Sequence, residues 1–227
     1  MDPIEDARAL VIERFPDALA AFLGDTVLSP HRTSTSDLDI LVILAGPPAP
    51  YRESLRFRSW PVETFVHDMD SLERFFGRDN QRRRPTLARL CADSVPVAGQ
   101  DQIINQIRER GRSTLAAGPR PLGDNELALL RYGLTDLLDD LAGSTDPGEI
   151  AVIGWNVWTA TAELALLLAG HWLGSGKWQL RELRSADPAL AGQMAAAFGD
   201  PALLTLAADE VLGRCGGRLW AGFRLAG

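Results

Sequence analysis

The residues best suited to chemistry are acidic side chains placed at the start of, or inside, apolar segments. Asp37 and Asp39 open the run Asp37-Leu-Asp-Ile-Leu-Val-Ile-Leu44, and Glu63 interrupts the run Pro61-Val-Glu-Thr-Phe-Val-His67. Alternate residues of a strand point to the same face, roughly 7 Å apart along the backbone, so both aspartates can reach one or two cations. Glu63 on a neighbouring strand would complete the set, because a buried carboxylate without a partner is costly. A bare Asp-x-Asp is also typical of a solvated turn before a strand.

Oxygen ligands of this kind suit Mg²⁺, which takes its remaining ligands from water and substrate phosphates. We therefore expect Asp37, Asp39 and Glu63 to be both metal-binding and catalytic. In a two-ion site, cations about 4 Å apart stabilise the attacking and leaving oxygens of an in-line displacement at phosphorus. Glu63 could also accept the proton of the acceptor, and Glu163 is the other candidate general base.

The elements that must position these residues can be read from the pattern of apolar residues. We expect a helix over 3–14, a buried strand over 19–23, central strands at 37–44 and 61–67, and further helices from about residue 70, after Pro85 and over 100–115. Helix breakers at 116–123 mark a boundary. The sequence thus predicts an α+β fold: a small mixed β-sheet with flanking helices in domain 1–118, followed by an all-α helical bundle in domain 119–227.

The second domain is expected to be helical throughout. Its most apolar segment, 149–173, fits either a bundle core or a membrane span, and the polar groups inside it favour the core. Glu163 is expected to be a buried general base or a core carboxylate paired with an arginine such as Arg131. No membrane partner is expected.

Composition excludes some classes of function. The net charge of −7 and the pI near 5.0 argue against binding of long nucleic acid. Cys91 and Cys215 show no metal-ligand spacing, so we expect free buried thiols. The acidic first residues lack the features of a signal peptide, and a cytoplasmic location is expected.

Beyond the acidic residues, the segments 23–26, 33–40 and 60–67 resemble the nucleotidyltransferase superfamily with the DNA polymerase beta-like fold, which includes kanamycin, lincosamide and streptomycin nucleotidyltransferases. The family pattern is an apolar strand, a Gly-Ser or Gly-Gly pair, then Asp-h-[Asp/Glu]-h, where h is apolar, and an acidic residue on a later strand. Segments 131–140 and 176–178 also look like the helical domain fused to such enzymes, so the resemblance covers most of the chain.

The resemblance implies an enzyme that moves a nucleoside monophosphate from an NTP, with ATP the first candidate, to a hydroxyl of a small-molecule acceptor with Mg²⁺ as cofactor. An antibiotic such as an aminoglycoside would suit an acidic cleft. A homodimer that closes the cleft is also implied. The alternatives are a degenerate fold that binds nucleotide or a protein partner without turnover, and a relative that modifies proteins by AMPylation.

The same resemblance implies nucleotide contacts from the residues Gly24, Asp25, Thr26, Ser36 and Lys177. The Gly-Ser pair of the family can align with Gly24-Asp25, which loses the hydroxyl, or with Asp25-Thr26, which loses the glycine; the second register needs no gap. In either register Asp25 brings a negative charge near the phosphates, which weakens nucleotide binding unless the carboxylate turns away or meets a cation. Lys177, the only lysine, is expected in a loop between helices.

Overall fold

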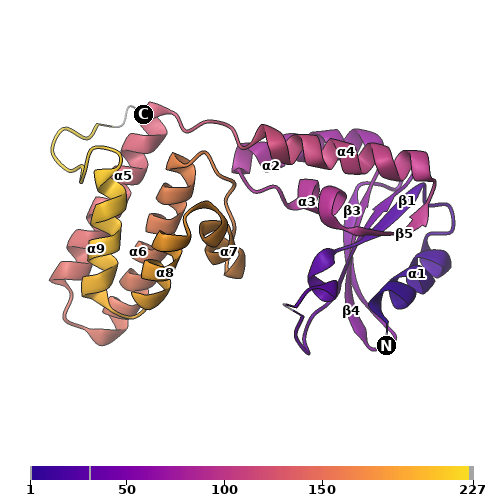
Figure 1. Ribbon diagram of the computed structural model, residues 1–227, viewed down its shortest axis with the longest axis horizontal. Helices are drawn as coiled ribbons and strands as arrows, with labels where there is room; N and C mark the ends of the chain where they lie inside the picture. Colours follow the sequence, from indigo (N-terminus) through magenta and orange to yellow (C-terminus); the bar gives the residue numbers. More distant parts are fainter. Residues whose placement is uncertain (1, 31, 225–227) are drawn as a thin grey trace. The chain divides into compact units, whose positions relative to one another are not determined.

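The structure is a computed structural model that describes residues 2–30 and 32–224, apart from the side chains of Asp25 and Thr26. It divides into two compact units, residues 1–118 and 119–227. Figure 1 shows strands and helices in the first unit and helices in the second. The predicted α+β fold class is confirmed.

The first unit is built on a sheet that has five strands in the described part of the chain. Their order is β3-β4-β2-β1-β5, and their bounds are Tyr51–Phe57, Trp60–His67, Leu38–Ile43, Ala20–Leu23 and Val95–Gly99. Strands β2 and β4 are parallel, and every other pairing is antiparallel, so the sheet is mixed as expected. The two parallel strands are the two long apolar runs of the sequence.

Helices cover both faces of this sheet (Figure 1). Helix α1 (Pro3–Arg14), where the sequence predicted it, packs on the face that carries Ile40 and Val62. The opposite face, which carries Leu41 and Ile43, packs against three helices: α2 (Met69–Arg82), α3 (Thr86–Asp93) and α4 (Asp101–Ala117). Because successive side chains of β2 point to opposite faces of the sheet, this strand contributes to two separate cores.

Strands β3 and β5 were not expected from the sequence. The hairpin between β3 and β4 turns at Arg58, whose φ is 53°, so the glycine or asparagine that usually marks such a turn is missing. Strand β5 carries Pro96 beside an irregularity in its pairing with β1. Proline is tolerated there because β5 lies at the edge of the sheet.

The second unit contains five long helical segments among the described residues: α5, α6, α7, α8 and α9, with bounds Asp124–Gly143, Pro147–Leu168, Lys177–Ala186, Pro188–Ala196 and Pro201–Gly213. Leu134, Leu138 and Leu141 lie on the buried face of α5, as their spacing predicts. Helix α6 is long and apolar enough to cross a membrane, but half of its most apolar window is buried within the unit, as in the core helix of a globular domain.

The expected pairing of Glu163 with Arg131 in the second unit is wrong. Arg131 donates to the carbonyls of Gly216 and Gly217 at 2.8–3.1 Å and does not pair with Glu163, which is half-buried. The guanidinium of Arg131 thus satisfies main-chain oxygens just beyond the end of α9. Trp155, in the most apolar segment of the sequence, is 48% exposed and stacks on the buried Trp158.

Candidate metal and nucleotide site

The three predicted carboxylates meet on one face of the sheet. In the parallel register of β2 and β4, Asp39 is the direct partner of Glu63, and residues paired in this way project to the same face. Asp37 precedes Asp39 by two residues, so its side chain points to the same face. One oxygen from each carboxylate lies within 4.8 Å of the others. The structure therefore brings together the residues that the sequence selected.

These carboxylates lie where the helices stop covering the sheet. Farther along the same face, Leu41, Ile43 and Phe65 pack against α2, α3 and α4. Asp37 is exposed, whereas Asp39 and Glu63 are half-buried. Access to water makes it less costly to place three acidic side chains side by side than it would be in a closed core.

Strand β3 adds two partners of Glu63 that sequence reasoning missed. Ser54 lies opposite Glu63 in the antiparallel register, and its hydroxyl donates to Oε1 at 3.4 Å. Arg52 forms an ion pair with Oε2 and places its guanidinium over the ring of Phe65, 5.0 Å from the centroid. Both oxygens of Glu63 are thus held from the neighbouring strand. The signal was available in the alternation of polar residues over 51–57, had that segment been recognised as a strand.

Gly24 lies directly beside the carboxylates at the end of β1. Its amide donates to the carbonyl of Asp39 at 2.7 Å. A Cβ at this position would lie 3.0 Å from Cβ of Asp39 and 3.3 Å from its carbonyl oxygen, closer than most side-chain contacts. A glycine therefore lets the end of β1 approach β2 closely at the site. A short 3₁₀ segment, η1 (Asp25–Leu28), follows, and the side chains of Asp25 and Thr26 lie outside the described part of the structure.

Ser36 helps to shape the turn that leads into Asp37. The amide of Thr33 donates to the hydroxyl oxygen of Ser36 at 2.9 Å, and the amide of Ser36 donates to the carbonyl of Thr33 at 3.2 Å. Thr35 also places its hydroxyl 3.1 Å from that of Thr33. Hydroxyl groups that bond to nearby backbone in this way fix the conformation of a short loop. The hydroxyl of Ser36 is therefore a part of the loop that carries Asp37.

Lys177 belongs to the second unit. It was expected in a loop, but it lies in a helix. It is the first residue of α7, directly after Gly176, and its side chain is exposed. Glu163, the other predicted candidate for a general base, also lies in the second unit, on α6. The cluster of Asp37, Asp39 and Glu63 is formed within the first unit alone.

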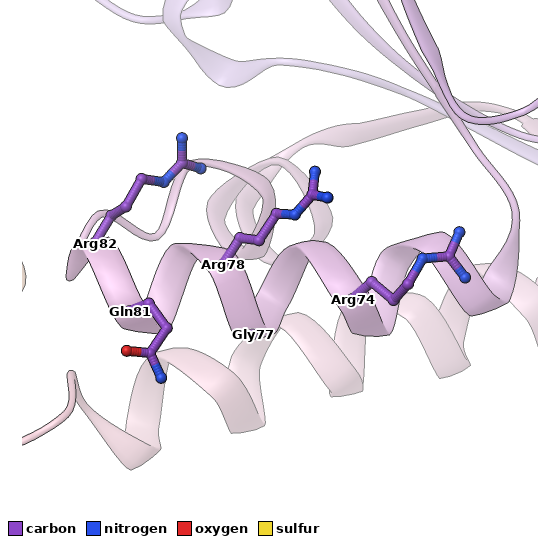
Figure 2. A pocket seen from close by; sticks show the side chains of 5 residues that line it. All are labelled: Arg74, Gly77, Arg78, Gln81 and Arg82. Carbon is purple, nitrogen blue, oxygen red and sulfur yellow. The ribbon is translucent and has the colours of Figure 1, made fainter.

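A row of arginines lies on α2, apart from the carboxylates. Figure 2 shows Arg74, Arg78 and Arg82 along one side of the helix, around a shallow hollow of about 480 Å³ that Gly77 leaves open. Arg82 is paired with Asp79 at 2.8 Å. Arg83, which follows at the end of α2, is only 4% exposed.

Comparison with known proteins gives a fold-level likeness. No protein-family model matches the chain, and no curated protein matches it. Among solved structures, one similar to this chain is the crystal structure of a nucleotidyltransferase-like protein from Exiguobacterium sibiricum 255-15. The two share 12% sequence identity with a TM-score of 0.44, over 93% of this chain and 75% of that chain.

Proposed function

We propose that this chain is a nucleotidyltransferase that moves a nucleoside monophosphate from an NTP to a hydroxyl group of a small molecule and releases pyrophosphate. One observation carries the proposal: Asp37, Asp39 and Glu63 present oxygens within 4.8 Å of one another from two parallel strands. Neighbouring ligands of an octahedral Mg²⁺ ion are about 3 Å apart, at ligand distances near 2.1 Å. The three carboxylate oxygens would therefore need to move only somewhat closer together to bind the ion. The donors are all hard oxygens, which fits the same ion.

In the proposed reaction, the acceptor oxygen forms a bond to the α-phosphorus, and the bond between that phosphorus and the bridging oxygen breaks. The pyrophosphate leaves, and Glu63 or water takes the proton of the hydroxyl. A bound Mg²⁺ supplies the positive charge that offsets the charge on the phosphate oxygens. Asp37 and Asp39 hold the ion, and Arg52 and Ser54 keep the carboxylate of Glu63 oriented.

The phosphates are proposed to lie beside the end of β1. The close approach of Gly24 to Asp39 leaves no side chain between them. Because the Gly24 amide already bonds to β2, the phosphates would meet the first amides of η1, which have no partner inside that short turn.

The test uses ATP labelled at the α-phosphate, Mg²⁺ and a panel of hydroxyl acceptors with the full-length protein. We expect transfer of label by the wild type and loss of transfer in Asp37→Ala and Asp39→Ala. Asp17→Asn, which changes an exposed acid at the other end of β1, is the control that should retain activity. Turnover that survives both alanine substitutions would refute the metal role of these residues.

A second candidate is nucleotide binding without turnover. It is favoured by Arg52, which already occupies one oxygen of Glu63, and by Asp25, which follows Gly24 where phosphates are proposed to lie. Calorimetry with ATP and Mg²⁺ separates the two candidates. Tight binding without release of pyrophosphate across the acceptor panel would favour the second.

A further inference from the structure

The face of β3 that adjoins Glu63 is basic. Alternation along the strand places Arg52, Ser54 and Arg56 on one face, and the bond from Ser54 to Glu63 identifies it as the face of the carboxylates. The other face of β3 packs against the core under α1, through Leu55 and Phe57. All three residues on the basic face are exposed, so they line a surface that a ligand can reach.

The two arginines differ in what already holds them. Arg52 pairs with Glu63 and rests over Phe65, yet 60% of its side chain is exposed. Arg56 has no hydrogen-bond or ion-pair partner among the described residues. The one acidic residue of β3, Glu53, pairs with Arg14 of α1 and so belongs to the other face. The open face of β3 itself therefore carries only positive charge, beside the carboxylates of Glu63, Asp39 and Asp37 on the same face of the sheet.

Sheet order places this surface opposite the proposed phosphate site. Strand β1 and Gly24 flank β2 on one side, whereas β4 and β3 flank it on the other. In an in-line displacement, the attacking oxygen approaches from the side opposite the leaving group. With pyrophosphate leaving on the β1 side, the acceptor hydroxyl approaches over β4 and β3.

We infer that the acceptor is an anionic hydroxyl compound, whose phosphate or carboxylate group is held by Arg52 and Arg56 while its hydroxyl faces the α-phosphorus. This inference rests on the proposed function and narrows its acceptor class. Guanidinium groups bind phosphate and carboxylate through paired N–H donors and repel a polycation. A cationic antibiotic, which would suit an acidic cleft, would here have to lie against two arginines.

The test measures binding as well as turnover. The full-length protein is saturated with Mg²⁺ and a non-hydrolysable ATP analogue, and four hydroxyl compounds are titrated by calorimetry at low ionic strength. Ribose 5-phosphate carries a phosphate, gluconate carries a carboxylate, ribose is neutral and kanamycin is a polycation. We expect at least one of the two anions to bind about tenfold or more tightly than ribose, and kanamycin to bind more weakly than that anion.

Arg56→Gln is the decisive variant, because Arg56 makes no described contact with the carboxylates. It should weaken binding of the preferred anion about tenfold and leave the affinity for the ATP analogue unchanged. Arg52→Gln should do the same and also disturb Glu63. Arg112→Gln, an exposed arginine of α4 without a described partner, is the matched control for loss of one positive charge.

The possible outcomes separate this inference from the proposed function. If the ATP analogue fails to bind with Mg²⁺, both are refuted. If the analogue binds but kanamycin or ribose binds at least as well as both anions, the acceptor class is wrong while the proposed function stands. Equal loss of anion binding in Arg56→Gln and Arg112→Gln would likewise overturn the inference, because it would show only a general effect of charge.

Discussion

Replacing Asp37 by Asn should stabilise the protein in the absence of divalent cations and make it less responsive to them. The three carboxylates lie within 4.8 Å of one another, so each repels the other two. Asp37 is exposed and has no described hydrogen-bond partner, which means that its substitution removes repulsion without breaking a contact. The side chains of Asp and Asn have the same shape, so packing is unchanged.

The magnitude follows from the separation and the exposure. Two unit charges at this separation repel by about 0.9 kcal/mol in a medium like water, so two pairs give about 1.7 kcal/mol. Physiological salt reduces this by roughly half over such a distance. The ion pair of Arg52 with Glu63 reduces it further, which leaves a gain of about 0.5–0.8 kcal/mol in the free energy of unfolding. That gain corresponds to a rise of about 1–3 °C in Tm.

The assay is thermal unfolding of wild type, Asp37→Asn and Asp17→Asn, each with EDTA and with increasing Mg²⁺. Asp17→Asn has the same change in net charge at an exposed turn and should match the wild type. In EDTA, Asp37→Asn should melt highest; as Mg²⁺ is added, the wild type should gain stability by mass action and the variant much less. A lower Tm for Asp37→Asn in EDTA, or equal Mg²⁺-induced shifts in all three proteins, would refute the reasoning.

Three further predictions concern single residues. Gly24→Ala should weaken Mg²⁺-dependent ATP binding about tenfold, because its methyl group pushes β1 away from β2; calorimetry should show no such loss for Gly77→Ala, whose Cβ meets open space. Burial lowers the pKa of His67 below its usual 6.5, so on acidification the unfolded state takes up the proton before the folded state does. The free energy of unfolding should therefore fall by up to about 1 kcal/mol per pH unit below pH 6.5. Urea titrations of His67→Gln should show a weaker dependence of this free energy on pH. Trp158→Phe removes a 2.8 Å bond from the indole to a buried carbonyl of α8 and should cost about 1–3 kcal/mol in urea unfolding, whereas Trp155→Phe, on an exposed ring without such a bond, should cost clearly less.

The central strands and their carboxylates could be predicted from the sequence because two local rules suffice there. Long apolar runs indicated β2 and β4, and alternation within each run indicated which residues share a face. The relation between Asp39 and Glu63 required one further fact, the parallel register of the two strands, which places them side by side. The family pattern supplied only an acidic residue on a later strand, and the parallel register is a finding of the structure.

Strand β3 and its side chains were missed for an equally physical reason. As an edge strand, β3 has one solvated face, so its apolar residues are few and its polar ones are charged. The turn that joins it to β4 has Arg58 at positive φ, so the glycine or asparagine that would indicate a turn is absent there. Arg52 and Ser54 could therefore not be assigned to the site, although they hold both oxygens of Glu63. The start of α7 at Lys177 was missed because the glycines before it suggested a loop.

The position of the site follows from how far the helices extend over the sheet. Along one face of β2, Asp39 is followed by Leu41 and Ile43, and only the last two lie under α2, α3 and α4. If the helices extended over one more pair of residues, they would bury Asp39 and Glu63 together. Desolvation of two adjacent carboxylates would cost several kcal/mol. The chain instead leaves this end of the face open, holds Glu63 with Arg52, and brings the backbone of Gly24 against Asp39. A divalent cation would relieve the repulsion that remains among the carboxylates, so the gain in stability on adding the cation measures how well the site binds it.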